Sequence, residues 1–497
     1  MQVIKNTKSI CPECLKALEA TIFEEDGKVF IKKNCPEHGG FQELYWSDFE
    51  QYQRAEKFRC DGEGIENPRT KTVKGCPLDC GICPEHKSHT ALAIIDVTNR
   101  CNLTCPVCFA NAAAAGYVYE PTPEQVTGML ENLRATKPVP ATALQFSGGE
   151  PTIRNDLFDL IRKAKELGFR HVEVNTNGIR ISQSVEYAKE LRASGVSTIY
   201  LQFDGLTPDV YKFIRGLDLL DIKMKALENL RQAGFKSVVL VVTLVKGVND
   251  SQLGDIIDFA VKNFDVIRCI NVQPVSLCGR LPQQEREKMR ITIPDFMRLV
   301  EEQTSGAIKT LDFYPVPVVV PVSKAVGSMQ EKRYVEFTAH PHCGMATYLF
   351  IENGKITPIT QKATIEKFWA SVKKIYEDAV KDGRKVKKRS LLLPVMKNVK
   401  LSFMRKYIWK VLSDGSYEAL GDLQRQSILL SSMHFMDPYN FDLERVQRCV
   451  IHYAVPDGRI IPFCTMNSIH RPEVEKKLGI PLKEWQRKHK VEISQPF

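Results

Sequence analysis

The sequence lacks the features that mark membrane-spanning and secreted proteins. No uninterrupted apolar run approaches the roughly 20 residues that a transmembrane helix needs. The opening residues, MQVIKNTKSICPEC, contain no apolar stretch of the kind found in secretory signal peptides. Low-complexity tracts are also absent. We therefore expect a globular protein in a reducing cytoplasm.

Acidic residues are missing from one long stretch. Ten Lys or Arg and no Asp or Glu lie between Arg384 and Lys410, so this stretch carries the whole net charge of +10. Its apolar residues recur every four positions, which predicts an amphipathic helix that would hold the protein peripherally on an anionic membrane surface. The residues assigned to this contact are Lys387, Lys388, Arg389, Phe403, Arg405, Lys406, Tyr407 and Trp409. A packed helix with a solvated basic side and an RNA-binding segment are the alternatives.

Cysteine, in contrast, is abundant. Most of the 15 cysteines occur in short-spaced groups, which is typical of metal binding rather than of a disulfide framework. Cys101, Cys105 and Cys108 form a C-x3-C-x2-C group. Three thiolates would leave one iron of an iron–sulfur cluster open to bind a substrate, whereas a structural zinc site would need a fourth ligand from elsewhere.

This cysteine group opens a long α/β alternation. Strand-like runs at 91–97, 143–147, 171–175, 198–203, 237–243 and 266–272 are separated by helix-like segments such as 155–168 and 221–234. Six such units predict parallel strands joined by crossover helices. The three cysteines directly follow the first strand, where active sites of parallel α/β folds lie. Further along, 312–322 reads as a strand, and residues around 451–462 read as a hairpin.

The C-x3-C-x2-C group, the SGGEP at 147–151 and the six units together resemble the radical S-adenosylmethionine (SAM) enzymes. The resemblance implies a partial (β/α)6 barrel and a [4Fe–4S] cluster on Cys101, Cys105 and Cys108 whose open iron binds SAM. It also implies a 5′-deoxyadenosyl radical that abstracts hydrogen from unactivated carbon, and a low-potential electron donor. Cofactor-binding positions carried over by motif are Ser147, Gly148, Gly149, Glu150, Asn175, Asn177, Asp204 and Thr243. For Asn177, an ordinary turn is the alternative.

Other cysteines form further candidate metal sites. Cys11, Cys14, Cys35 and His38 flank an expected hairpin and could bind zinc or a single iron, with Cys60 as an alternative to His38. Cys76, Cys80 and Cys83 suit an auxiliary iron–sulfur cluster, again with Cys60 as the nearest further ligand. Cys343, Cys449 and Cys464 could hold another, completed by Cys278 or Cys269, although Cys269 could equally be a buried apolar residue.

The cysteine-rich segment 75–112 and the N-terminal CPEC…CPEHG are similar to those of the archaeal tetraether lipid synthase group. That resemblance implies joining of isoprenoid lipid chain ends by carbon–carbon bonds. A radical SAM methyltransferase acting on a pterin such as methanopterin is the first alternative. A nucleic-acid-modifying protein is the second, but the ribbon has few basic residues, which makes a nucleic-acid partner unlikely.

We divide the chain into four expected parts. Residues 1–60 would form a zinc-ribbon or rubredoxin-like metal domain, and residues 61–90 an auxiliary-cluster segment. Residues 91–280 would form the radical SAM barrel, and residues 281–497 a mainly helical, basic C-terminal domain with an auxiliary-cluster site.

Overall fold

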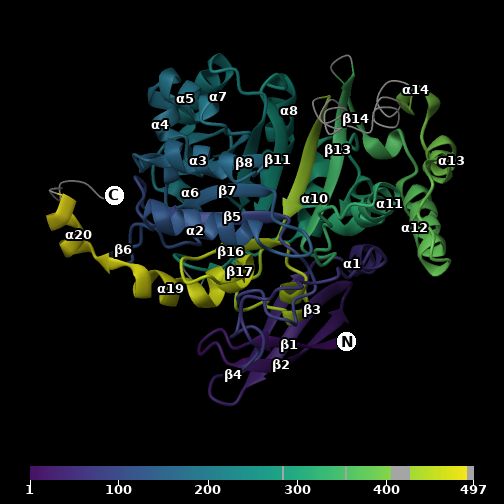
Figure 1. Cartoon of the computed structure of the whole chain (residues 1–497), viewed down its shortest axis with the longest axis horizontal. Coiled ribbons are helices and arrows are strands. Elements are labelled where there is room, and N and C mark those ends of the chain that lie inside the picture. The colour runs from purple at the N-terminus through teal and green to yellow at the C-terminus, as the bar shows by residue number, and fades with distance from the viewer. Residues whose placement is uncertain (282–284, 353–354, 405–425, 490–497) are drawn as a thin grey trace.

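The computed structural model describes residues 1–281, 285–352, 355–404 and 426–489. The chain begins with a four-stranded antiparallel sheet of β1 (Gln2–Ile10), β2 (Ala17–Glu25), β3 (Lys28–Cys35) and β4 (Gly39–Trp46), followed by α1 (Phe49–Glu56). The hairpin expected between the two cysteine pairs is β2–β3, with Asp26 and Gly27 at positive φ in its turn. This small sheet lies against the underside of the larger domain in Figure 1.

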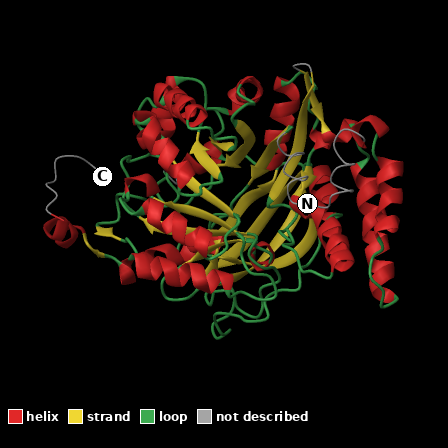
Figure 2. Ribbon diagram, turned by 45° about the horizontal axis from the view of Figure 1, so that its top comes forward, coloured by secondary structure: helices red, strands yellow, loops and turns green. Residues whose placement is uncertain are grey.

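The central sheet confirms the predicted α/β barrel. Six parallel strands lie side by side in chain order: β5 (Leu92–Thr98), β7 (Ala143–Gly148), β8 (His171–Thr176), β9 (Thr198–Gln202), β10 (Val238–Leu244) and β11 (Ile267–Pro274). The crossover helices are α2 (Pro123–Arg134), α3 (Leu157–Glu166), α4 (Ile179–Gln183), α5 (Val185–Ala193), α6 (Pro208–Arg215), α7 (Leu220–Gln232) and α8 (Leu253–Lys262). Figure 2 shows these helices outside the strands.

Alternation of side chains along each strand separates the core from the barrel interior. Leu144 and Phe146 on β7 are fully buried in the main apolar core, whereas Gln145 and Ser147 line a cavity. Because side chains alternate in the same way on β8, Val172 and Val174 point outward into the core. On the later strands, polar groups point inward to the cavity. The helices therefore cover an apolar surface, while the interior keeps amide and hydroxyl groups for a ligand.

Strands from the C-terminal region extend the sheet at both ends. β15 (Ser427–Met433) runs parallel to β11, and β13 (Gly344–Glu352) pairs antiparallel with β15. β14 (Lys355–Pro358) and the short β12 (Tyr314–Pro315) both pair with β13. At the opposite edge, β16 (Ile451–Ala454) runs parallel to β5 and forms the expected hairpin with β17 (Ile460–Pro462).

Helices make up much of the remaining C-terminal region. They include α10 (Ile293–Gln303), α11 (Val320–Gln330), α12 (Ile365–Lys381), α17 (Leu443–Gln447), α19 (Arg471–Leu478) and α20 (Leu482–His489). Helices α11, α12 and α13 (Lys388–Asn398) pack side by side at one end of the molecule (Figure 1). No helix in the described ranges is both long enough and apolar enough to span a membrane.

One prediction for this region is wrong. The stretch 312–322 is a strand only at β12, because Pro317 and Pro321 favour the 3-10 turn Val316–Val319 and the start of α11. The predicted amphipathic helix through Val399, Phe403, Tyr407 and Val411 extends beyond the described residues; within them, α13 ends at Asn398, Val399 is extended and Leu401–Phe403 is helical. Phe403, in α14 (Leu401–Phe403), is buried against Phe350 and so does not face a lipid surface.

The other residues expected at a membrane surface lie partly outside the described chain. Lys387, Lys388 and Arg389 are exposed at the start of α13, whereas Arg405, Lys406, Tyr407 and Trp409 lie outside the described residues.

Candidate active site and metal centres

The three cysteines of the C-x3-C-x2-C group lie in the loop after β5 and line the cavity at the carboxyl ends of the strands. Cys101 is buried, and burial raises the pKa of its thiol well above the usual range, with a contribution from Glu150. The pKa of Cys105 is also raised by burial, but the nearby Arg215 guanidinium opposes that shift. Thiolates at these positions therefore require a cation or metal centre to compensate their charge.

The Gly-Gly-Glu segment after β7 is held directly against the start of the cysteine loop. The Gly149 amide donates to the Thr98 carbonyl at 2.7 Å, and the Glu150 amide donates to the Arg100 carbonyl at 2.9 Å. A Cβ on Gly149 would lie 2.1 Å from the Arg100 carbonyl oxygen. A glycine here lets the backbone approach closely, and the backbone that it approaches is that of the cysteine loop.

Glu150 is an internal anchor of this site. Its carboxylate is buried and accepts hydrogen bonds from the Asn177 amide at 2.7 Å and from the Thr152 and Thr176 hydroxyls at 2.6 and 2.8 Å. Burial raises the pKa of Glu150, although these hydrogen bonds favour the ionised form. The carboxylate thereby ties the ends of β7 and β8 together beside Cys101.

The predicted asparagines lie on the wall of the same cavity. Asn175 donates to the Ser147 hydroxyl at 3.1 Å, and Asn177 donates to the Asn102 side chain at 2.7 Å. The Asn177 contact joins the end of β8 to the cysteine loop. Gly178 follows at positive φ, so the alternative interpretation of this pair as a turn also describes its backbone.

Asp204 lies behind the cavity wall, where it positions an arginine that the sequence analysis missed. The Asp204 carboxylate is fully buried and forms a two-pronged ion pair with Arg215, at 2.7 and 2.9 Å. Arg215 also donates to the Thr243 hydroxyl at 2.9 Å and lines the cavity beside Cys105. Asp204 and Thr243 therefore orient a cation toward the cysteine loop. The only sequence signal was the position of Arg215 at the end of a helix, which specifies no partner.

Gln145 is a further polar residue of the interior that was not predicted from the sequence. Its side chain lines the cavity and has no hydrogen-bond partner among the described residues, although it is only 6% exposed. Other interior amides are already engaged: Gln202 accepts from Lys223 at 2.9 Å, and Gln273 donates to the Tyr200 hydroxyl at 2.9 Å. Lys223 is completely buried, and desolvation lowers its pKa to about 7.

Ligand spacing separates a single-ion site from the other cysteine groups. In a tetrahedral zinc site with Zn–S bonds of about 2.3 Å, neighbouring sulfurs lie about 3.8 Å apart. The ribbon residues Cys11, Cys14, Cys35 and His38 meet this requirement, with all four donor atoms within 4.8 Å of one another and 3.9 Å between the sulfurs of Cys14 and Cys35. A hydrogen bond from His38 lowers the pKa of Cys35 to about 6, which favours its thiolate.

The remaining cysteine triplets are spread more widely. Among the described residues, those around Cys101, Cys80 and Cys449 do not bring three donor atoms within 4.8 Å of one another. The described donor atoms of these triplets therefore do not have the spacing of a single-ion site. The donor set of the ribbon therefore fits one metal ion, and the cysteine ligands assigned to clusters stay predictions.

The two auxiliary groups predicted from the sequence lie close to each other. Cys76, Cys80, Cys449 and Cys464 belong to one apolar cluster of side chains. Hydrogen bonds from Cys76 and His470 lower the pKa of Cys80 to about 6 despite its burial. Cys83 is also buried and completes the C-x3-C-x2-C group in this loop. Both ligand sets remain predictions.

The candidate additional ligands have different surroundings. The electrostatic neighbours of Cys60 include Lys324 and Glu336. Cys278 lies next to Ser276 and Ser468, each 3.5 Å from its sulfur, and Cys269 lies 4.0 Å from Ser431 in the barrel wall. In the described part of the chain, none of the three forms a hydrogen bond with a cysteine of the predicted triplets, and their assignment as ligands stays a prediction.

Comparisons with known proteins place this architecture in a family. The family model of the radical SAM superfamily matches residues 95–260, and that of the HMPTM N-terminal zinc ribbon domain matches residues 3–47. The chain belongs to the radical SAM superfamily and has the [4Fe–4S] cluster and SAM chemistry of that class. It is 51% identical over 498 residues to a 7,8-dihydro-6-hydroxymethylpterin dimethyltransferase of Methanocaldococcus jannaschii, with 98% of each chain covered.

More distant matches cover smaller parts of the chain. A probable GTP 3′,8-cyclase of Methanothermobacter marburgensis is 29% identical over 185 residues, covering 37% of this chain and 58% of the relative. The crystal structure of Streptococcus suis SuiB bound to S-adenosylmethionine is 20% identical, with a TM-score of 0.35, and covers 44% of this chain and 48% of that one.

The full-length relative corrects the predicted function. Tetraether lipid synthesis is contradicted, because the relative that matches almost the whole chain is a pterin dimethyltransferase. The lipid substrate and the anionic membrane surface were inferred with that function and have no support from the comparisons. The cysteine-rich motifs on which the lipid prediction rested also occur within the length matched by the methyltransferase, so they did not discriminate between the two activities.

Proposed function

We propose that this protein is a radical SAM methyltransferase that acts on 7,8-dihydro-6-hydroxymethylpterin or a close analogue. The observation that carries the proposal is the 51% identity to the M. jannaschii dimethyltransferase over 98% of both chains. Identity at this level over the whole length includes the ribbon, the barrel and the C-terminal region, so it concerns more than the shared superfamily chemistry.

The cavity supports a flat, polar heterocyclic substrate. A pterin has a hydrogen-bonding edge and an aromatic face. The cavity offers the side-chain amides of Gln145, Gln273 and Asn175 from the barrel strands, and the rings of Phe435 and Phe463 from the C-terminal region. Amide groups can pair with ring nitrogens and an exocyclic carbonyl, and aromatic rings can stack on the heterocycle.

Within this cavity, Gln145 is the residue best suited to recognise the substrate. Unlike Gln202 and Gln273, it has no partner within the described chain, so its donor and acceptor are both free for a ligand. Its position on β7, two residues before Ser147, places it deeper in the barrel than the cysteine loop.

The chain's own residues position and shield the reacting groups. When bound, the cluster and SAM supply a 5′-deoxyadenosyl radical, which is the reagent for an unactivated carbon. Gly148, Gly149 and Glu150 hold the cysteine loop in place, and we assign contacts with SAM to this segment and to Ser147, Asn175, Asn177 and Thr243. Auxiliary clusters at the Cys76 and Cys343 groups and a low-potential electron donor complete the proposal.

A product assay tests the assignment. The reconstituted protein would be incubated anaerobically with SAM, dithionite and 7,8-dihydro-6-hydroxymethylpterin. We expect 5′-deoxyadenosine formation to increase with the pterin, and mass spectrometry to find pterin carrying added methyl groups. A preparation that cleaves SAM but shows neither effect would contradict the pterin assignment while leaving the radical SAM class intact.

A substitution tests the substrate cavity. Gln145→Leu should raise the KM for the pterin by about five- to thirtyfold, because one well-placed hydrogen bond to a buried polar group is worth about 1–2 kcal/mol. SAM cleavage without pterin should persist. Gln42→Leu, on the exposed face of β4, is the matched control. Equal pterin KM values for the two variants would remove Gln145 from the binding site.

A further inference from the structure

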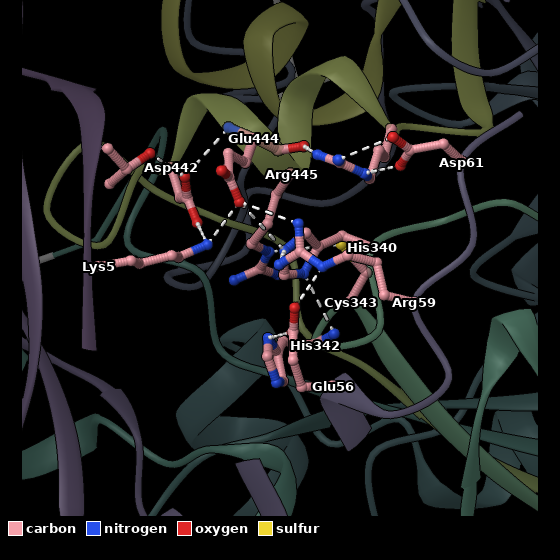
Figure 3. A network of polar contacts seen from close by, with 12 residues as sticks. Lys5, Glu56, Arg59, Asp61, His340, His342, Cys343, Asp442, Glu444 and Arg445 are labelled. Atoms are coloured by element: carbon pink, nitrogen blue, oxygen red, sulfur yellow. Dashed lines mark hydrogen bonds and ion pairs between the residues drawn. The ribbon is translucent and has the colours of Figure 1, made fainter. Parts of the chain in front are cut away.

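A buried arginine on α17 points at one of the auxiliary cysteines. Arg445 is 2% exposed, and its Nε lies 3.4 Å from the sulfur of Cys343. Its Nη2 donates to the carbonyl of His434 at 2.6 Å. Figure 3 shows the guanidinium in the middle of a polar network that joins the N-terminal sheet, the loop after α1 and the C-terminal region.

Arg445 has no carboxylate within ion-pair distance among the residues that the structure describes. The acidic residues of the network serve other groups. Asp442 accepts hydrogen bonds from Thr7 and Tyr45, each at 2.8 Å. Glu444 pairs with Lys5 at 2.6 Å and with Arg59 at 3.1 Å. The Tyr45 ring lies 5.6 Å from the Arg445 guanidinium, and the side chain with which the guanidinium forms a hydrogen bond in the described chain is Cys343.

Burial of this cation requires a compensating anion. Removing a guanidinium from water without a charged partner is strongly unfavourable. The guanidinium instead faces the sulfur of Cys343 at 3.4 Å, and this sulfur attracts a cation strongly only when it is anionic. Neutral thiols would not supply this attraction, whereas thiolates bound to a metal–sulfur core would.

A second cysteine of this group, Cys464, also accepts a hydrogen bond from an N–H group. The backbone amide of Met436 donates to the sulfur of Cys464 at 3.3 Å. Hydrogen bonds to ligand sulfur and nearby positive charge stabilise the reduced state of an iron–sulfur cluster, because reduction adds negative charge to it. Both features raise the reduction potential.

We propose that Arg445 is the counter-charge of a cluster held by Cys343, Cys449 and Cys464, and that it raises the reduction potential of this cluster. Arg445 acts through the ligand sulfur and is a positioning residue, not a catalytic one. The inference rests on the buried charge and the N–H···S contact, so it holds whether or not the substrate is a pterin.

Potentiometric EPR tests the proposal. In a full-length Cys101→Ala/Cys105→Ala/Cys108→Ala background, which removes the SAM cluster, Cys343→Ser would identify the signal of this centre. At a fixed applied potential, Arg445→Met should lower the ratio of reduced to oxidised cluster at least tenfold. For a one-electron couple this corresponds to a decrease of about 59 mV in the reduction potential of the cluster. Arg445→Lys keeps the charge and should shift the ratio less.

Arg59→Gln is the matched control. Arg59 lies in the same network, but its guanidinium contacts Glu56, Glu444 and His340 rather than sulfur. We expect this variant to leave the potential unchanged. An unaltered potential in Arg445→Met with full iron content would overturn the proposal, as would equal shifts in Arg445→Met and Arg59→Gln.

A measurement that leaves Arg445 in place covers the case in which Arg445→Met fails to fold. Pulsed EPR of the reduced background protein grown with 15N-arginine should detect a 15N coupling from the Nε bonded to Cys343. Arg445→Lys should abolish the coupling. A spectrum without any 15N coupling from arginine would show that the guanidinium does not contact the cluster.

Discussion

Gly149→Ala should separate the SAM site from the rest of the molecule. The new Cβ would lie 2.1 Å from the Arg100 carbonyl oxygen and 2.9 Å from the Asn99 carbonyl oxygen, whereas ordinary contacts begin at 3.4 Å. Both contacts are with backbone, so a side-chain rotation cannot relieve them. The Gly-Gly-Glu segment would have to move away from the cysteine loop by roughly 1.3 Å, the difference between 3.4 and 2.1 Å.

This displacement has a definite energetic cost. It would weaken the two backbone hydrogen bonds that tie Gly149 and Glu150 to the loop, each worth about 1 kcal/mol net. Overpacking adds about 1–3 kcal/mol. Because about 1.4 kcal/mol corresponds to a factor of ten, we expect SAM affinity and 5′-deoxyadenosine formation to fall at least tenfold. The ribbon metal and the other iron should be retained.

Gly128→Ala is the control for this substitution. Gly128 lies within α2 and has nothing within 4 Å of an added Cβ, so alanine there should stabilise the helix by about 0.5–1 kcal/mol. SAM binding would be measured by equilibrium titration of the anaerobic proteins, and cleavage by chromatography. Wild-type SAM affinity and cleavage in Gly149→Ala would refute the close-packing explanation of this segment.

Three further predictions concern the metal sites and acid sensitivity. Replacing Cys101, Cys105 and Cys108 by Ala should abolish 5′-deoxyadenosine formation after dithionite reduction but leave other iron bound; a normal yield would contradict the assignment of the SAM cluster. Cys14→Ser/Cys35→Ser should remove one metal ion per chain by elemental analysis and lower the Tm, because the ribbon ligands would lose their common ion; unchanged metal content would exclude the ribbon site. Burial lowers the pKa of His89 from 6.5 to about 4, so the unfolded chain binds a proton that the folded chain excludes, and stability falls by up to about 3 kcal/mol as pH drops from 6.5 to 4. In His89→Gln the amide oxygen can still accept the 2.8 Å hydrogen bond from the Glu336 backbone amide. This variant should lose less Tm than the wild type between pH 7.5 and 5. An equal loss would show that His89 does not contribute to the acid sensitivity of the fold.

Local sequence patterns predicted the barrel because its determinants are local. Each strand is a short run of apolar residues with a fixed period, and each is followed by a helix. Cys101 and Gly149 were placed at the same edge of the sheet because the carboxyl ends of parallel strands coincide there. The ribbon ligands were found for a similar reason, since Cys14 and Cys35 flank one hairpin.

Features that depend on distant partners were missed. Arg215 gains its role from Asp204, and the free amide of Gln145 is recognisable only when the partners of the other interior amides are known. The strand pattern at 312–322 failed because β-branched residues interleaved with prolines also suit a 3-10 turn and the first turn of a helix. The narrower lipid-synthase resemblance failed because cluster-binding motifs report the cofactors and not the substrate.

The two C-terminal strands that complete the sheet have a consequence for how the protein is made. β5 emerges from the ribosome early, but its outer neighbour β16 begins at Ile451 and pairs with it through Leu92. At roughly 5–20 residues per second, about 20–70 s separate the synthesis of the two strands. During that interval the nascent chain presents an unprotected, apolar strand edge that can capture other chains. We expect biogenesis to depend on chaperones that shield this edge, and chains truncated before β16 to aggregate rather than to accumulate as folded barrels.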